Sequence, residues 1–220
     1  MTCKLYILPS SDLNTEDPVF TKAMSDPRLE KIKRFAHEAD KKLAMAAELC
    51  LCAVSSELGL PIPPQYKCGE TGKPEFSVSP PYFNISHCEG YAVCAVANAP
   101  LGADAEPSHR HVDEKILSHL LHAGEACLSP LWKWVEKESF VKLTGEGLTR
   151  PLGSFITSPK GVFDRKGKRL ACLSRYELHG LCIAISSYEP IDSSVVKVLS
   201  PDYIKGLLSA HQEKLISSQN

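Results

Sequence analysis

One stretch of this chain, residues 102–142, constrains the fold more than any other, because it joins a strand pattern to a helix pattern. It opens with residues 102–106 (GADAE), where small and acidic residues alternate with a period of two, as in a β-strand. Asp104 and Glu106 would then point to one face of the strand. The stretch closes with residues 134–142 (WVEKESFVK), where Glu138 and Lys142 share one face of a helix.

If the end of this strand meets the helix, three carboxylates converge beside one or two lysines. Hard oxygen ligands next to lysines are suited to Mg²⁺ carrying a phosphate group. The same residues have a simpler interpretation, in which Asp104 and Glu106 face solvent and Lys137 and Glu138 form an ordinary pair on a helix surface. Motifs elsewhere in the chain bear on this choice.

The length of 220 residues suits one large domain or two small ones with a real core. A net charge of -1 provides no general attraction to nucleic acid or to membranes, so recognition of an anion must be local. No stretch reaches transmembrane length. We therefore expect neither a nucleic-acid partner nor a membrane partner.

The chain has nine cysteines, an odd number with no Cys-x-x-Cys pair. Most lie in apolar runs such as residues 49–53, which is typical of buried free thiols in a reducing compartment. The apolar segment at the N-terminus is too short for a signal peptide. These features together predict a cytoplasmic protein.

Strand and helix patterns are mixed along the chain, which predicts an α/β (α+β) fold. Alternating or apolar runs predict strands at residues 4–8, 75–78, 83–87, 91–97, 155–157, 169–173, 181–185 and 195–199. Capping and periodicity predict helices from residue 26, at 40–58, at 112–121, from 130 to about 144, and from 201 to about 216.

A faint internal repeat adds to this prediction, because residues 90–96 (GYAVCAV) resemble residues 180–185 (GLCIAI). The repeat suggests a pair of similar α/β subdomains related by a pseudo-twofold axis. We place the N-terminal half at residues 1–101 and the C-terminal half at residues 102–220. A cleft between the halves is the expected place for the active site.

Two basic clusters interrupt an otherwise neutral sequence. Residues 28–42 carry six basic and three acidic side chains, so a local anion site is an alternative to a solvated helix face. Residues 160–169 carry five basic side chains and one acid. This second cluster is most simply a solvated hairpin, with an acidic or phosphate-rich partner as the alternative.

Two other kinds of site fit the sequence less well. Zinc could be bound by histidines, which stand at positions 109, 111, 119 and 122, but no cysteine or third histidine completes a zinc-like spacing. Ser86 and His87 could suggest a nucleophile and its base. Adjacent residues on a strand point to opposite faces, which argues against a serine hydrolase.

The ordered set of motifs resembles the Sfp-type 4′-phosphopantetheinyl transferases, the larger, pseudo-dimeric members of their superfamily. That family carries Gly-(Ile/Val)-Asp-x-Glu, followed by (Trp/Phe)-(Ser/Cys/Thr)-x-Lys-Glu-(Ala/Ser)-x-x-Lys, which stand here at residues 102–106 and 134–142. Similar segments are found at residues 31–35, 72–74, 83–87, 145–148 and 151–152. The resemblance runs from about residue 25 to residue 186.

The resemblance implies a monomeric enzyme with coenzyme A bound in the cleft between the halves. A serine hydroxyl of an apo acyl or peptidyl carrier protein would attack the β-phosphate of coenzyme A. The phosphopantetheine group would move to that serine, and adenosine 3′,5′-bisphosphate would leave. Mg²⁺ would bind the pyrophosphate.

The family's functional residues carry over to ten positions of this chain. Metal binding falls to Asp104, Glu106 and Glu138, catalysis to Glu138 and Lys142, and coenzyme A binding to Arg28, Lys31, Lys73, Ser86, His87, Lys137 and Lys142. By this resemblance, Glu138 is also the candidate base for the incoming serine. The two residues of the basic helix would meet the 3′-phosphate, Lys73 would lie along the adenine edge, and the others would contact phosphates.

The chain also departs from the family pattern. Ala103 replaces a branched residue, Val135 replaces a small polar residue, and residues 41–43 (KKL) stand where many members place an arginine. The interval from Asp104 to Glu138 is about one loop shorter than in the best-known members, so residues 107–130, which help to receive the carrier protein in the family, should differ most.

Two other functions stay open on the sequence alone. One is a Mg²⁺-dependent phosphohydrolase that acts on nucleotides or coenzyme A, with water as the nucleophile. The other is a non-catalytic module that binds coenzyme A or a carrier protein. The sequence does not identify the natural carrier or decide whether acyl coenzyme A is accepted.

Overall fold

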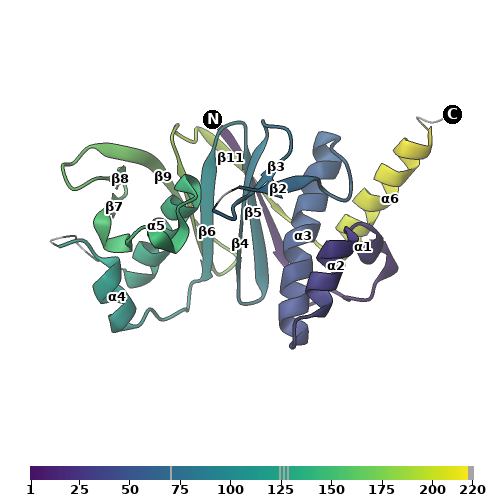
Figure 1. The fold of residues 1–220 in the computed structure, drawn as a ribbon, viewed down its shortest axis with the longest axis horizontal. Coiled ribbons are helices and arrows are strands. Elements are labelled where there is room, and N and C mark those ends of the chain that lie inside the picture. Colours follow the sequence, from purple (N-terminus) through teal and green to yellow (C-terminus); the bar gives the residue numbers. More distant parts are fainter. Residues whose placement is uncertain (70, 124, 126, 128, 218–220) are drawn as a thin grey trace.

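The computed structural model describes residues 1–69, 71–123, 125, 127 and 129–217. The fold is a mixed α/β arrangement, as the sequence predicts (Figure 1). The strands are β1 (Thr2–Pro9), β2 (Tyr66–Cys68), β3 (Pro74–Phe76), β4 (Tyr82–Cys88), β5 (Tyr91–Ala97), β6 (Leu101–Pro107), β7 (Ile156–Ser158), β8 (Gly161–Phe163), β9 (Arg169–Leu178), β10 (Leu181–Ser187) and β11 (Ser193–Val198). The helices are α1 (Pro18–Lys22), α2 (Asp26–Lys33), α3 (Glu38–Leu58), α4 (Glu114–Leu120), α5 (Pro130–Thr144) and α6 (Pro201–Ser217), with short 3₁₀ turns η1 (Gly147–Thr149) and η2 (Leu152–Ser154).

The strands form two main sheets and one small hairpin. The first sheet has the order β11-β1-β5-β4, and the second has the order β6-β10-β9-β8-β7. In the first sheet β1 runs antiparallel to β5 and parallel to β11. In the second sheet β10 runs antiparallel to both β6 and β9.

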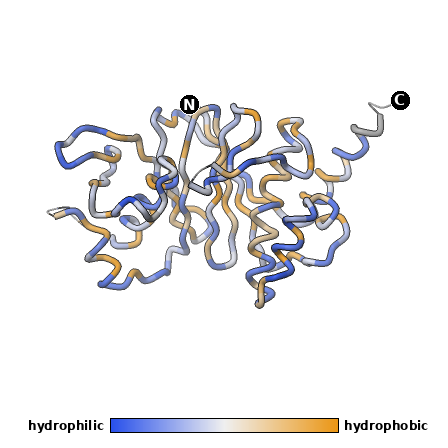
Figure 2. Tube along the Cα trace, in the orientation of Figure 1, coloured by the Kyte–Doolittle hydropathy of each residue, from blue (hydrophilic) through white to orange (hydrophobic). Residues whose placement is uncertain are grey.

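The two sheets pack face to face, and the alternation of side chains along each strand explains why. In β1, Leu5 and Ile7 pack against residues of β6 and β10, whereas Tyr6 and Leu8 join the core beneath α3. In β10, Ile183 faces the first sheet, and its neighbours on the chain turn toward α5. The molecule is therefore layered as α3, first sheet, second sheet and α5, with hydrophobic segments along the central strands and α3 (Figure 2).

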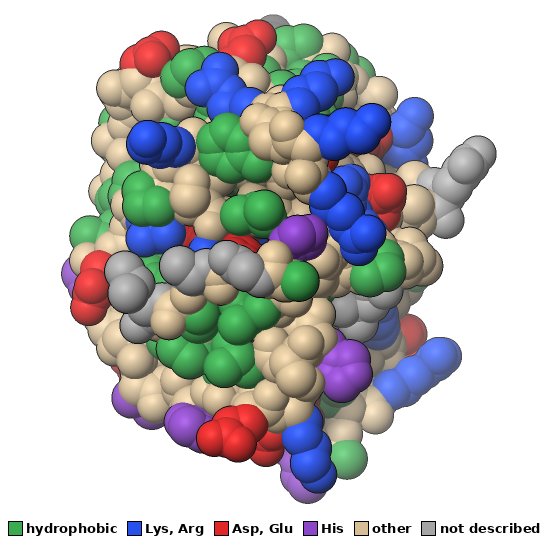
Figure 3. Space-filling model, turned by 90° about the vertical axis from the view of Figure 1, so that its left-hand side faces the viewer, with side chains coloured by type: hydrophobic (Ala, Val, Ile, Leu, Met, Phe, Trp, Pro, Cys, Tyr) green, Lys and Arg blue, Asp and Glu red, His purple; other side chains and the backbone are tan. Residues whose placement is uncertain are grey.

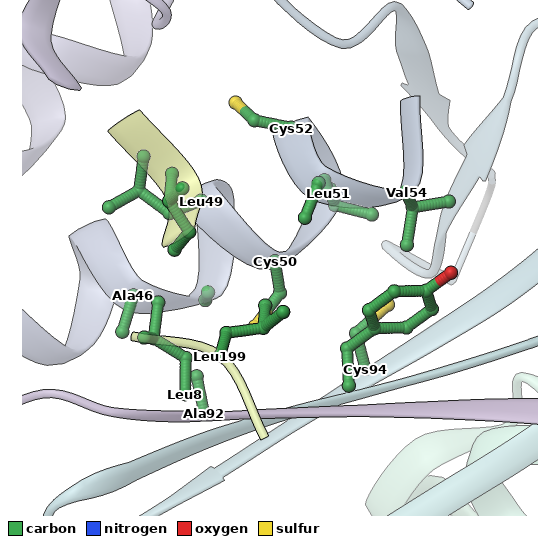
Figure 4. Packing of buried hydrophobic residues seen from close by; sticks show 14 of the residues in the cluster. Leu8, Ala46, Leu49, Cys50, Leu51, Cys52, Val54, Ala92, Cys94 and Leu199 are labelled. Carbon is green, nitrogen blue, oxygen red and sulfur yellow. The ribbon is translucent and has the colours of Figure 1, made fainter. Parts of the chain in front are cut away.

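Helix α3 is held against the first sheet by a long apolar face. Figure 4 shows residues of this core, which lies between the helix and the strands. The labelled members are Leu8, Ala46, Leu49, Cys50, Leu51, Cys52, Val54, Ala92, Cys94 and Leu199. The helix ends at Gly59, whose φ of 67° is left-handed, and the predicted stop is therefore confirmed.

The contact of α5 with β6 is unusually close and depends on Gly102. A Cβ atom at Gly102 would lie 2.1 Å from the carbonyl oxygen of Ser139 and 2.2 Å from the amide nitrogen of Leu143. Both are backbone atoms, so they cannot turn aside. Gly102, Asp104 and Glu106 lie on the same face of β6. The close packing of Gly102 on α5 therefore brings the acidic residues of the strand to the helix.

The C-terminal segments return to the first half of the chain. Strand β11 pairs with β1, and Ile204 and Leu208 of α6 pack in the core beneath α3. Residues 193–217 therefore lie beside the N-terminal elements. The boundary between residues 1–101 and 102–220, and the pseudo-twofold relation between the halves, remain predictions.

Candidate functional site

The candidate site is built where the edge strands of the two sheets meet. Side chains of β4 bridge to the backbone of β6: Asn84 Oδ1 accepts a hydrogen bond from the Ala103 N–H at 2.8 Å, and Ser86 Oγ accepts one from the Ala105 N–H at 3.2 Å. Both side chains are buried. Their role in joining the sheets explains why polar residues alternate along this strand.

Asp104 lies at the centre of a hydrogen-bonded group. Its Oδ1 atom accepts a hydrogen bond from Ser86 Oγ at 2.8 Å and one from Lys142 Nζ at 2.6 Å. Lys142 Nζ also donates to Ser86 Oγ at 3.0 Å. The expected meeting of this strand with this helix is thus observed between Asp104 and Lys142.

Glu138 lies on the same side of α5 and faces Asp104 closely enough to sense its charge. Burial and the negative charge of Asp104 raise the pKa of Glu138, although Lys142 and Arg110 act in the opposite direction. Oε1 of Glu138 and Oδ2 of Asp104 are both buried without a hydrogen-bond partner among the described residues. An unpaired buried carboxylate oxygen is costly, so these two atoms are suited to receive a cation or a proton.

Glu106 is directed to different partners. Its Oε1 atom accepts a hydrogen bond from the indole N–H of Trp134 at 3.2 Å and forms an ion pair with Arg110. In this conformation Glu106 is therefore not joined to Asp104 and Glu138. Across the described residues no cluster of three or more histidine, cysteine, aspartate or glutamate side chains is arranged to hold a metal ion.

The donors nevertheless match a hard divalent cation in part. Two carboxylate oxygens are buried and unpartnered, they come from two elements that pack closely, and a third carboxylate lies two residues further along β6. Mg²⁺ is usually bound by one or two carboxylates together with water and substrate phosphates. Asp104 and Glu138 fit this pattern without the third carboxylate.

Lys137 does not join this group. Its ammonium group is fully buried, forms an ion pair with Glu125 at 2.8 Å and donates to the carbonyl oxygens of Leu152 and Phe155 at 2.9 and 2.6 Å. Successive residues on a helix are about 100° apart, so Lys137 and Glu138 point in different directions. The predicted contact of Lys137 with phosphates finds no support in this arrangement.

A groove of about 680 Å³ lies on the α3 side of the first sheet. Its lining includes Arg28 and Lys31 from α2 and His87 from β4. Arg28 Nε lies 3.0 Å from the buried carboxylate of Glu48, and Tyr66 OH donates to the same carboxylate at 3.1 Å. The groove thus collects three of the predicted coenzyme A ligands, one of which is anchored by a buried acid.

His87 connects this groove to the carboxylates. It also lines a second hollow of about 470 Å³, together with Glu106 and Arg110. His87 and Ser86 point to opposite faces of β4, since Ser86 is buried toward β6 and His87 is exposed. The prediction that adjacent residues separate in this way is confirmed.

Lys73 lies at the edge of a third hollow, of about 300 Å³. Its ammonium group donates to the carbonyl oxygens of Leu101 and Leu143 at 3.1 and 3.2 Å. Burial lowers the pKa of Lys73. The lysine therefore ties the turn before β3 to β6 and α5, beside the groove rather than inside it.

The comparisons with known proteins agree with the geometry. A 4′-phosphopantetheinyl transferase of Bacillus subtilis is 32% identical over 146 residues, which cover 60% of this chain and 65% of that relative. The transferase Sfp of B. subtilis strain 168 is 29% identical over 64% of this chain and 68% of its own length. The transferase gsp of Aneurinibacillus migulanus is 33% identical over 41% of this chain and 42% of its own length.

The chain is similar to the Sfp-type 4′-phosphopantetheinyl transferases. No protein-family model matches it. The matched regions span 65% of the B. subtilis transferase and 42% of gsp, so less than two thirds of these two relatives is represented. The remaining length has no counterpart in the alignment.

The departures from the Sfp-type pattern have physical explanations in the fold. Ala103 faces the first sheet and is fully buried, and the close packing of the two sheets accommodates a small side chain there. Val135 is also fully buried and packs against Cys182 and Ala184 of β10. An apolar residue therefore fits this position of α5.

Residues 107–130, the segment expected to differ most from Sfp-type relatives, contain α4, which lines one side of an apolar hollow. The hollow has a volume of about 620 Å³ and is lined by Ile116, Leu120, Trp134 and Leu152 among others. In Figure 3, hydrophobic side chains gather on one face of the molecule, with lysines and arginines above them. Residues 124, 126 and 128 of the segment lie outside the described residues.

The histidines of the rival zinc hypothesis contact the backbone instead. His119 Nδ1 lies 2.8 Å from the carbonyl oxygen of Lys115, and His122 Nδ1 lies 2.8 Å from that of Ala123. His109 and His111 line the hollow beside Glu106. The nine cysteines are free, as the sequence predicts.

Sequence reasoning missed a buried ionic network on the far side of α5. Glu125 accepts hydrogen bonds from Lys133 Nζ at 3.0 Å and from the Thr157 N–H at 2.8 Å, in addition to its pair with Lys137. Glu136 accepts a hydrogen bond from Thr157 Oγ1 at 2.6 Å and forms an ion pair with Arg175. The sequence shows that α5 is rich in charged residues, but this does not identify which residue each of them pairs with.

Proposed function

We propose that this protein transfers the 4′-phosphopantetheine group from coenzyme A to a serine hydroxyl of an apo acyl or peptidyl carrier protein. The serine oxygen forms a bond to the β-phosphorus of coenzyme A. The bond from that phosphorus to the bridging oxygen breaks, and adenosine 3′,5′-bisphosphate leaves. The serine proton is accepted by a base of the protein, either directly or through water.

The observation that carries this proposal is the group formed by Asp104, Glu138 and Lys142. Two unpartnered carboxylate oxygens and one ammonium group lie together at the junction of the sheets. The groove with Arg28, Lys31 and His87 lies nearby and offers positive charge for phosphates. The names of the relatives agree with this chemistry.

Each residue has a defined task in the proposal. Glu138 is the base, because burial raises its pKa and so makes its carboxylate a stronger proton acceptor. Lys142 stabilises negative charge on the phosphates. Ser86 holds Asp104 and Lys142 in place, and His87 contacts a phosphate oxygen.

Mg²⁺ held by Asp104 and Glu138, with Glu106 as the third carboxylate, would neutralise charge on the transferring phosphoryl group and orient it. The buried, unpartnered oxygens of the first two residues support this assignment. Glu106 could bind the metal only after its ion pair with Arg110 had broken.

The basic groove is assigned to the nucleotide end of coenzyme A. Arg28 and Lys31 would bind the 3′-phosphate, and Lys73 would lie along the adenine edge. Lys137 is assigned to the stability of α5 rather than to phosphate binding. The apolar hollow formed by α4 and η2 is assigned to the carrier protein, by analogy with the family.

The test is a transfer assay with purified protein, coenzyme A, Mg²⁺ and several apo carrier proteins. We expect a gain in the mass of a carrier equal to one phosphopantetheine group, together with release of adenosine 3′,5′-bisphosphate. Release of nucleotide without modification of any carrier would instead support the phosphohydrolase alternative. Binding of coenzyme A without release would support the non-catalytic alternative.

Variants test the assigned residues. Glu138→Gln and Asp104→Asn should abolish transfer, and Lys142→Met should lower the rate by about 10²-fold or more. Arg28→Ala should raise KM for coenzyme A more than KM for 3′-dephospho-coenzyme A. Glu146→Gln, which changes an exposed acid paired with Arg150, is the control and should transfer at the native rate.

A further inference from the structure

Arg110 lies just beyond β6 and has no role among the residues assigned so far. Its guanidinium group forms an ion pair with Oε1 of Glu106, four residues earlier. The same group lies 5.3 Å from the centre of the Trp134 ring, and the Trp134 indole donates to the same carboxylate oxygen. A carboxylate, a guanidinium group and an indole thus form a closed group at the edge of the site.

This group balances charge at the site. Asp104 is paired with Lys142 and Glu106 is paired with Arg110, whereas Glu138 has a buried oxygen without a partner among the described residues. The two cations are partly exposed, at 28% for the Lys142 side chain and 37% for the Arg110 side chain. A partly exposed cation can move aside, which the fully buried Lys137 cannot do.

We propose that Arg110 is a displaceable internal counter-ion, which occupies Glu106 in the metal-free protein and leaves it when a divalent cation binds. The inference rests on the proposed metal site. It explains how the negative charge of Glu106 is neutralised before metal is present, and why Glu106 is paired with Arg110 rather than joined to Asp104 and Glu138.

The physical basis is competition for one oxygen atom. Oε1 of Glu106 already accepts the indole N–H, and a further cation can approach it only after the guanidinium group has moved. The guanidinium group of Arg110 could stack on the Trp134 ring after it leaves Glu106, because arginine stacks favourably on aromatic faces. Arg110 could then remain beside the site with its positive charge directed toward a phosphate.

The experiment measures Mn²⁺ binding to the full chain by isothermal titration calorimetry, without substrates. Removing the competing charge in Arg110→Gln should tighten Mn²⁺ binding by roughly two- to fivefold, which is the size expected for the loss of a partly exposed ion pair. Arg110→Lys keeps the charge but not the planar stacking group. It should bind Mn²⁺ with an affinity nearer to that of the native protein.

The chain offers a closely matched control in Arg175. It also forms an ion pair with a glutamate of the second half, Glu136, and it lies 5.5 Å from the centre of a tryptophan ring, that of Trp132. It differs in that its partner, Glu136, is not one of the proposed metal ligands. Arg175→Gln should therefore leave the Mn²⁺ affinity unchanged.

A second measurement separates competition from a purely structural role. Mn²⁺ should raise the melting temperature of Arg110→Gln by more than it raises that of the native protein, because tighter binding stabilises more. If folded Arg110→Gln binds Mn²⁺ no more tightly than the native protein, the counter-ion role is wrong while the metal site stands. If the native protein binds no Mn²⁺, the metal site and this inference both fail, and the transfer assay decides the proposed function separately.

Discussion

At the scale of single residues, the three carboxylates of the site are in three different electrostatic environments. Asp104 is neutralised by Lys142 and Glu106 by Arg110. Glu138 forms no direct ion pair among the described residues, and burial together with the charge of Asp104 raises its pKa. The fold therefore disfavours the charged form of Glu138.

We predict that Glu138→Gln increases the stability of the metal-free protein at neutral pH. A raised pKa means that the folded state holds the proton more tightly than the unfolded state does, so folding is penalised once both states have lost it. The penalty is absent below the usual glutamate pKa and grows as the pH rises through the folded pKa. Urea denaturation of both proteins across this range should show a gap that closes at acidic pH.

Glu57 of α3 is the control with the opposite sign. Burial acts to raise its pKa, but hydrogen bonds from Lys197 and Tyr6 outweigh burial and lower it. Its contribution to stability is present above the usual glutamate pKa and is lost as the pH falls. Glu57→Gln should therefore be less stable than the native protein at neutral pH, and the same sign for both variants would contradict the assignment.

At the scale of elements, helix α5 carries a structural lysine and a site lysine on different faces. Lys137 is paired with Glu125, with side chains that are 0% and 1% exposed, and Lys142 contacts Asp104 and Ser86. The buried pair holds α5 against the segment before it and against the turns that follow it. Lys142 is available for chemistry because Lys137 already attaches α5 to the neighbouring segments.

We predict that Lys137→Ala lowers the free energy of unfolding by about 2 kcal/mol, because it removes one of the two ammonium groups that pair with the buried Glu125 carboxylate and leaves that carboxylate with Lys133 alone. Lys142→Ala should change the unfolding free energy far less and should instead lower the transfer rate. The two quantities are measured by urea denaturation and by the transfer assay. A Lys137→Ala protein of native stability would show that the buried pair contributes nothing.

The close packing of β6 on α5 leads to a prediction at Gly102. Gly102→Ala should destabilise the fold by about 1–3 kcal/mol or more, because the new methyl group meets backbone atoms of α5. Gly206 of α6 is the control, since a Cβ there has no neighbour within 4 Å. Gly206→Ala should raise the melting temperature slightly through helix propensity, so calorimetry should give shifts of opposite sign.

The local patterns of the sequence were sufficient to place most elements. Alternation identified the strand at residues 102–106, and the Ser129-Pro130 start and Gly145 stop identified α5. These predictions succeed because capping and periodicity are properties of neighbouring residues. These patterns leave the meeting of Asp104 with Glu138 and Lys142 as a hypothesis, and the packing of β6 on α5 is what brings the three residues together.

The partners of charged residues could not be predicted in the same way. The family resemblance assigns Lys137 to phosphates, whereas in the structure its ammonium group pairs with Glu125. Glu106 was assigned to metal alone, and its contacts with Arg110 and Trp134 depend on how a loop returns to a helix. Such pairings are set by tertiary packing, which spacing along the chain does not record.

At the scale of the whole molecule, the two sheets share one core. Leu5, Ile7 and Val93 of the first sheet pack with Ala103 and Ile183 of the second, and all are fully buried. The active-site group depends on this contact, because β4 supplies Ser86 and β6 supplies Asp104. The sheets place β4 against β6, and helix α5, which packs on β6, adds Lys142 and Glu138 to the site. No helix in the described part of the chain is long and apolar enough to cross a membrane.

This shared core predicts that the chain unfolds as one cooperative unit, although a boundary near residue 101 is expected from the sequence. If either half unfolded alone, one face of the common core would be exposed to water. We therefore expect no intermediate in which only one half is folded. Both tryptophans lie in α5 and report on the second half, whereas Cys50 and Cys94 are buried beneath α3 and report on the first. Tryptophan fluorescence and pulse labelling of thiols, followed through the same urea series, should give one common midpoint. Two separate midpoints would mean that the halves are independent domains and that the Asp104–Ser86 contact is not maintained by a common core.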